Sequence, residues 1–84
     1  MEKYNVTVVK SGRDGDTACF LVESEGQRFE ITNCHLTVNP FVVGYRINSY
    51  FGSYRYEKDK ITFYCEAFLR LDENEKGGEL ILRK

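Results

Sequence analysis

Apolar and polar residues alternate with a period of two along most of this chain, which predicts β-strands rather than helices. The pattern is clearest over residues 61–71, where every odd position is apolar and most even positions are polar or aromatic. No segment shows a helical period of 3.6 residues, and no internal repeat is present. The alternation predicts strands at 3–10, 17–24, 27–33, 44–56, 61–71 and 79–83.

Residues that favour turns separate these segments. Glu25-Gly26 predicts a tight hairpin turn, because glycine readily adopts the positive φ that such turns require. Pro40 has no backbone N–H to donate, so residues 34–43 are expected to be irregular, as a short helical turn or a loop between strands. Polar or charged loops are predicted at 11–16, 57–60 and 72–78.

Five or six short strands joined by such turns must each bury one face. A small closed or half-closed barrel does this and leaves few exposed edges, whereas a two-sheet sandwich usually needs a longer chain. We therefore predict a single all-β domain over residues 1–84, a five- to six-stranded antiparallel barrel of the OB-fold or SH3-like type. The side chains predicted to point inward are Val6, Val8, Phe20, Val22, Phe29, Ile31, Ile47, Phe63, Cys65 and Leu69.

The order of these features resembles the OB-fold barrels, in particular the S1-like group of RNA-binding domains. An early run of three strands leads into an irregular connection, and the segment Val43-Gly44-Tyr45-Arg46-Ile47-Asn48-Ser49-Tyr50-Phe51 resembles the start of the strand that follows in that group. A turn and a further strand come next, as in that family. The resemblance covers about residues 3–69 and implies a barrel that binds single-stranded RNA.

Charge and aromatic residues are distributed unevenly. The formal net charge of the whole chain is −1, so no overall basic field exists to attract nucleic acid. Residues 41–71 nevertheless carry five basic and three acidic groups, and they hold nine of the twelve aromatic residues. We therefore expect any binding surface to lie within residues 41–71.

The sequence offers no recognisable catalytic constellation. His35 is the single histidine, and its neighbour Cys34 would point to the opposite face of a strand, so the two make a poor nucleophile–base pair. Gly12 and Gly15 are not followed by a helix and so do not form a phosphate-binding loop. We predict no catalytic residues and no enzyme activity.

Metal and cofactor sites are likewise not expected. Cys19, Cys34, Cys65 and His35 lack the paired spacing of a zinc site, and Ser11–Asp16 lacks the ligand spacing of a calcium loop. The odd number of cysteines, with no secretion signal at the N-terminus, favours an intracellular, cytoplasmic location. No apolar run approaches the roughly 18 residues of a membrane span.

One surface is predicted to bind a partner. If the strand over residues 44–56 is regular, its even positions share a face, and the even positions of 61–71 form the outward face of the next strand. Side by side, these faces would present aromatic rings and arginines. The predicted binding residues are Arg46, Tyr50, Tyr54, Tyr64, Phe68 and Arg70.

Two functions and one structural alternative are compatible with such a surface. Tyrosine and arginine are enriched where proteins contact each other, which favours a non-catalytic interaction, adaptor or inhibitor domain, or self-association. Aromatic rings on a barrel also stack on unpaired bases, as in single-stranded nucleic-acid binding. Alternatively, the rings merely suit β-strands and are covered by another segment.

Overall fold

The computed structural model describes residues 1–37 and 48–84, and these form six β-strands and no helix. The predicted residues Arg46 and Ile47 lie outside the described part. None of the described residues belongs to a helix of the length and apolarity that would cross a membrane. The strands are β1 Glu2–Asp14, β2 Thr17–Ser24, β3 Gln27–Thr37, β4 Asn48–Lys58, β5 Ile61–Leu71 and β6 Gly77–Arg83.

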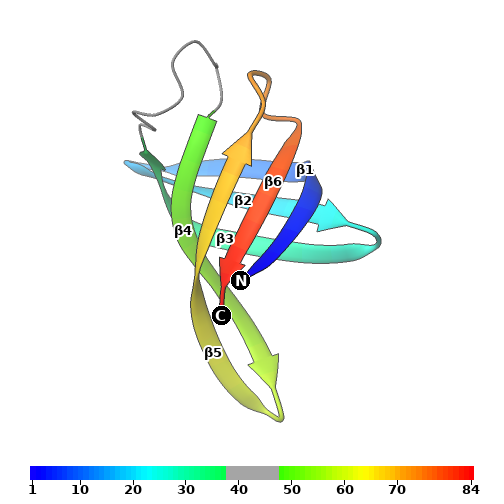
Figure 1. Cartoon of the computed structure of the whole chain (residues 1–84). Coiled ribbons are helices and arrows are strands. Elements are labelled where there is room, and N and C mark those ends of the chain that lie inside the picture. Colours follow the sequence, from blue (N-terminus) through cyan, green and yellow to red (C-terminus); the bar gives the residue numbers. More distant parts are fainter. Residues whose placement is uncertain (38–47) are drawn as a thin grey trace.

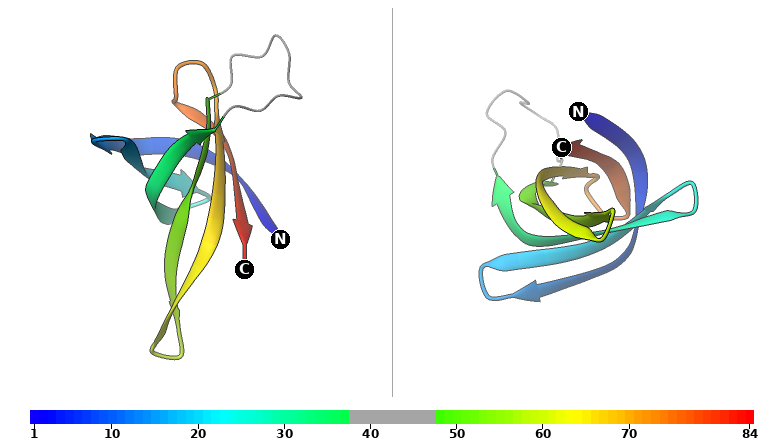
Figure 2. Two further views of the ribbon diagram at one scale, coloured as in Figure 1. Left: turned by 90° about the vertical axis from the view of Figure 1, so that its left-hand side faces the viewer. Right: turned by 90° about the horizontal axis from the view of Figure 1, so that it is seen from below.

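The six strands close into one antiparallel barrel, which confirms the predicted fold class (Figure 1). Each strand pairs with the next along the chain, and β1 pairs with β6 to complete the ring. Seen from below, the ribbon surrounds a central axis, with the two termini close together at one side (Figure 2). OB-fold barrels have a Greek-key order, so the likeness to them lies in the small, closed antiparallel barrel rather than in this sequential strand order.

Two of the connections are two-residue turns with positive φ at both central positions. These are Glu25-Gly26, with φ of 50° and 81°, and Asp59-Lys60, with φ of 54° and 64°. Positive φ at both positions is the mark of type I′ turns, whose twist matches that of the flanking strands. The first turn is as predicted, and the second is shorter than the predicted loop 57–60.

Several strands extend further than the alternation predicted. β1 continues through 11–14, β3 through 34–37, and β6 begins two residues early, at Gly77. Irregularities in the ladders explain the first two, because the register shifts between Val8 and Lys10 and between Thr32 and His35. A bulge changes which face the following side chains occupy. The strict alternation therefore breaks at the bulge, and the part of the strand beyond it is not predicted.

The core fills the barrel from all six strands, and most of the predicted inward set belongs to it. Val8 and Cys65 are partly buried and pack against the core. The buried members of the predicted set are Val6, Phe20, Val22, Phe29, Ile31 and Leu69.

Two predictions are wrong, one about the burial of a side chain and one about the faces of a strand. Phe63 does point to the same side of β5 as Leu69, but it lies beyond the rim of the barrel and is 40% exposed. On β4 the faces are reversed: Tyr50 is 2% exposed, whereas Phe51 points outward and is 43% exposed. Aromatic residues occur on both faces of β4, so the apolar pattern alone does not show which face points into the barrel.

Close packing of β4 against β3 depends on Gly52. A Cβ atom at this position would lie 2.6 Å from the Cys34 sulfur and 2.8 Å from the carbonyl oxygen of Thr32. The bulge in β3 directs Cys34 into the core at this point, and the absence of a side chain on Gly52 gives it room.

The β4–β5 hairpin projects well beyond the rest of the barrel (Figure 1). β3 pairs with β4 only as far as Ile31 with Tyr54, and β6 pairs with β5 only as far as Arg83 with Glu66. Farther out, the two strands pair only with each other, up to Lys58 with Ile61. We call residues 55–64 the hairpin extension.

Candidate functional site

The outer wall of the barrel carries an apolar row that crosses three neighbouring strands. Phe51 on β4 pairs with Phe68 on β5, and Phe68 pairs with Ile81 on β6. Directly paired residues in antiparallel strands share a face, so these three side chains lie side by side on the outside. Together with Met1, which is 93% exposed, we call them the outer strip.

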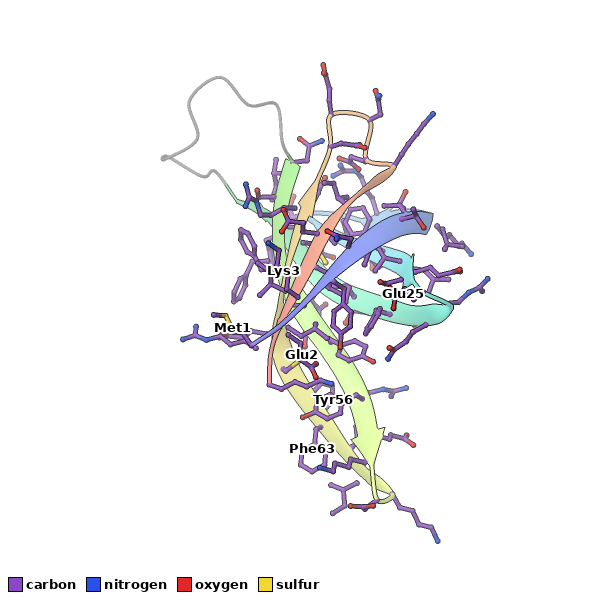
Figure 3. The ribbon with its side chains drawn as sticks, turned by 45° about the vertical axis from the view of Figure 1, so that its right-hand side comes forward. Met1, Glu2, Lys3, Glu25, Tyr56 and Phe63 are labelled. Carbon is purple, nitrogen blue, oxygen red and sulfur yellow. The ribbon has the colours of Figure 1, made fainter. Side chains whose placement is uncertain are left out.

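The outer strip lines a shallow groove. All four residues of the strip, Met1, Phe51, Phe68 and Ile81, line this groove. Glu66 and Arg83 complete the lining. Figure 3 shows Met1 beside Lys3 at one flank of the barrel, near the start of β1. A contiguous apolar area of this kind on a surface is a feature of binding sites.

Ion pairs border the strip on both sides. On one side Arg83 Nη1 lies 3.3 Å from Glu66 Oε2, and on the other Lys3 Nζ lies 2.7 Å from Glu79 Oε2. The hydrogen bond that Lys3 donates holds the pKa of Glu79 below its ordinary value. Each of these basic groups is therefore matched by a carboxylate.

The structure divides the six predicted binding residues. Phe68 belongs to the outer strip. Arg70 follows two residues later on the same outward face of β5, where it lies opposite Glu79 in the ladder between β5 and β6. Tyr64 also points outward and is 69% exposed, but it lies on the hairpin extension, beyond the Glu66–Arg83 pair. Arg46 lies outside the described residues.

Tyr50 and Tyr54 are on the inner face, contrary to the expectation that they share a surface with Phe68. The Tyr50 hydroxyl donates a hydrogen bond to Glu75 Oε1 at 2.7 Å and accepts one from Arg13 Nη2 at 3.3 Å. Burial, followed by the bond to Glu75, raises the pKa of Tyr50. Asn48 donates to the same carboxylate oxygen at 3.0 Å. This cluster ties the loop between β5 and β6 to the inner face of β4.

Tyr54 belongs to a row of rings that runs from the core onto the hairpin extension. Phe29 contacts Tyr54 with ring centroids 5.5 Å apart, Tyr54 stacks on Tyr56 at 5.9 Å, and Tyr56 stacks on Phe63 at 5.5 Å. We call these four rings the inner aromatic row. Figure 3 shows Tyr56 and Phe63 one below the other along the hairpin.

A cation covers the middle of the inner aromatic row. The ammonium group of Lys84 lies 4.6 Å from the centroid of Tyr56 and 6.0 Å from that of Tyr54, within range of a cation–π contact. Glu2 Oε2 lies 3.0 Å from the same ammonium group. This hydrogen bond raises the pKa of Lys84 and lowers that of Glu2. The two ends of the described chain thus meet at the base of the hairpin extension.

Sequence reasoning missed Phe51 and Ile81. Phe51 stands at an odd position of its strand, and only the even positions were expected to face outward. Ile81 stands between Leu80 and Leu82, and three consecutive apolar residues conceal which of them points outward. The burial of both leucines, at 0% exposure, identifies Ile81 as the outward one.

Comparisons with protein-family models, with curated proteins and with solved structures found no match for this chain. Its own geometry therefore carries the functional argument. Among residues 1–37 and 48–84, no group of three or more His, Cys, Asp or Glu side chains is placed to hold a metal ion.

Cys34 and Cys19 differ in their exposure to solvent. Cys34 is 1% exposed, and burial raises its pKa from 9.0 to about 11, whereas Cys19 is exposed. The thiolate is the reactive form, so at pH 8 Cys34 holds about a hundredth of the thiolate of an ordinary thiol.

We expect iodoacetamide at pH 8 to alkylate Cys19 rapidly and to leave Cys34 unmodified until the protein unfolds. Peptide mass spectrometry after timed quenching measures both rates, and addition of a denaturant provides the control in which all three thiols react. Equal rates for Cys19 and Cys34 in the folded protein would contradict the burial of Cys34.

Proposed function

We propose that this chain is a non-catalytic binding domain that docks a partner protein on the outer strip. Phe51, Phe68 and Ile81 offer contiguous apolar area on a rigid sheet, so little conformational entropy is lost when they are covered. Aromatic residues are also enriched at the centres of protein interfaces, where they contribute much of the binding energy.

The observation that carries this proposal is the charge around the strip. Arg83 is paired with Glu66 and Lys3 with Glu79, so two of the cations that border the strip are matched by carboxylates, and a third, Arg70, lies opposite Glu79 on the neighbouring strand. An apolar centre with a polar rim is the arrangement of protein interfaces. A nucleic-acid surface instead needs unmatched cations, because phosphate contacts supply much of its affinity.

We expect Phe51→Ala to weaken partner binding by about tenfold or more, as for a ring at an interface centre, while leaving the barrel folded. In the test, the wild type, F51A and the control variant Y64A are each immobilised. Quantitative mass spectrometry then compares the amounts of partner protein that each of the three retains. Tyr64 is a suitable control because its ring is also exposed on β5 but lies outside the strip. A partner lost with F51A and kept with Y64A supports the proposal.

Retention of the same proteins at the same levels by all three baits would overturn it. The resemblance to S1-like RNA-binding barrels suggests the alternative function, binding of single-stranded nucleic acid, and a second experiment tests it. Fluorescence anisotropy with single-stranded RNA and DNA oligonucleotides is expected to show no binding. Salt-sensitive binding that weakens by about 1–3 kcal/mol in Y64A or F68A would instead favour recognition of unpaired bases.

A further inference from the structure

One cluster of side chains away from the outer strip has the composition of a site for an ammonium group. The ammonium group of Lys84 lies 4.6 Å from the ring centroid of Tyr56 and 6.0 Å from that of Tyr54. A carboxylate oxygen of Glu2 lies 3.0 Å from the same nitrogen. The negative face of an aromatic ring attracts a cation, and proteins recognise alkylammonium ligands in this way. A carboxylate beside the rings adds an ion pair and a hydrogen-bond acceptor.

The cluster is assembled from both ends of the described chain and the middle of β4. Tyr54 and Tyr56 stand two residues apart on the inner face of β4, with their rings at an interplanar angle of 14°. Glu2 is the first residue of β1 and pairs with Leu82 of β6. Figure 3 shows Glu2 just above Tyr56, at the foot of the hairpin extension. The rings and the carboxylate thus stand on paired strands, whereas Lys84 lies beyond the last paired residue of β6.

The rings and the carboxylate do not need Lys84 to hold their positions. Both tyrosines belong to the inner aromatic row, and each keeps a further ring contact within that row. The Glu2 Oε2 atom, beside the ammonium group, is buried. A buried carboxylate oxygen costs free energy unless a cation or a donor lies beside it. If Lys84 moved away, the same place would therefore attract another cation.

The cluster is open to solvent. The Lys84 side chain is 35% exposed and the Glu2 side chain is 44% exposed, so a ligand can reach the rings without unfolding of the barrel. Ion pairs with this much exposure contribute little to stability, because water screens them. Lys84 can therefore be displaced at little cost to the fold.

The rings and the carboxylate together define the class of ligand. The rings favour a nitrogen that carries methyl groups, since these are apolar and share the positive charge. Glu2 favours a nitrogen that keeps an N–H, because only such a nitrogen can donate a hydrogen bond to Oε2. A mono- or dimethylated lysine side chain has both features, whereas a trimethylated one has no N–H.

We propose that Tyr54, Tyr56 and Glu2 form a binding site for a partner's lysine side chain, preferably mono- or dimethylated, and that Lys84 occupies this site in the free protein. Lys84 is then an intramolecular competitor, and the apparent affinity for the ligand falls with the fraction of molecules in which Lys84 is bound. The site lies on the inner face of β4 and does not depend on the function proposed for the outer strip.

Removal of the competitor tests the proposal. The probe is Nα-acetyl-lysine methylamide, dimethylated at Nζ, and NMR titration of the Tyr54 and Tyr56 ring protons measures its dissociation constant. Lys84→Ala is expected to bind the probe about tenfold or more tightly than the wild type. The matched control is Lys3→Ala, which removes a lysine whose ion pair with Glu79 lies on the outer wall. K3A should bind the probe as the wild type does.

Further substitutions in the K84A protein locate the bound probe. Glu2→Gln and Tyr56→Ala are each expected to weaken its binding by about fivefold or more. Tyr64→Ala removes an exposed ring from the outward face of the same hairpin and should leave binding unchanged. The trimethylated probe should bind more weakly than the dimethylated one. Circular dichroism confirms that each variant keeps the fold of the wild type.

The wild type offers a direct view of the competition. The Hε protons of Lys84 should be shifted upfield by the ring of Tyr56, and saturating probe should return them toward their random-coil position. Absence of probe binding to K84A, equal affinities of K84A and the wild type, or unchanged binding in K84A/E2Q would each overturn the proposal. Tighter binding of the trimethylated probe would also overturn it, because Glu2 would then not act as the acceptor.

Discussion

Replacing Phe29 with alanine should lower the free energy of unfolding by about 3–5 kcal/mol, the usual cost of removing a large aromatic side chain from a core. Phe29 is 1% exposed, and its ring contacts Tyr4 at 4.8 Å and Tyr54 at 5.5 Å. A barrel of this size has only a small margin of stability, so this loss is expected to remove much of it. Urea denaturation followed by far-ultraviolet circular dichroism measures the loss.

Phe63→Ala is the matched control, since it removes the same side chain from the other end of the inner aromatic row. Phe63 is 40% exposed and stacks on Tyr56, so we expect a loss of only about 1 kcal/mol. Equal losses in the two variants would show that the hairpin extension is covered in solution and that its rings are core.

A second large effect is expected from Gly78→Ala. Gly78 pairs with Leu71 on one side and with Val6 on the other, and a Cβ atom here would collide with the carbonyl oxygen of Arg70. The obstacle is backbone held between two ladders, so it cannot turn aside as a side chain could. We expect a loss of about 3 kcal/mol or more, measured by the same urea titration.

Gly12→Ala tests whether any added methyl group has this effect. Its Cβ atom would lie 3.2 Å from the Cys19 sulfur, which is the end of an exposed side chain that can rotate away. The expected change is within about 1 kcal/mol. Wild-type stability in G78A would mean that β6 does not approach β5 as closely as the structure shows.

The fold could be predicted from the sequence because most strands alternate cleanly. β2 has the predicted bounds, and β5 has both the predicted bounds and the predicted inner face. The inner face of β5 did not imply burial at Phe63, however. Alternation reports which way a side chain points, whereas burial also depends on whether other strands reach that position, and here β3 and β6 end their pairing before it.

The candidate site was harder to predict than the fold. Phe68 could be predicted because the alternation in β5 shows which of its faces points outward. Phe51 could not be predicted, because Tyr50 and Phe51 are adjacent aromatic residues and no polar position beside them shows which face of β4 points outward. The register of β4 against β5 pairs even with odd positions, as in Phe51 with Phe68. A one-residue difference in register moves every side chain to the other face, and it therefore separated Tyr50 and Tyr54 from the predicted surface.

The sequential strand order has a consequence for how the chain reaches its native state. Five of the six ladders join neighbouring strands and can form as local hairpins, each closing a short loop. The sixth ladder joins β1 to β6, with Thr7 opposite Gly77 and Glu2 opposite Leu82, and so brings together nearly the whole length of the chain. Its loop-closure entropy is the largest of any pairing, although this entropy grows only slowly with loop length. Closure of the barrel is thus expected to come last, after a curled five-hairpin sheet has already brought its two edges into proximity.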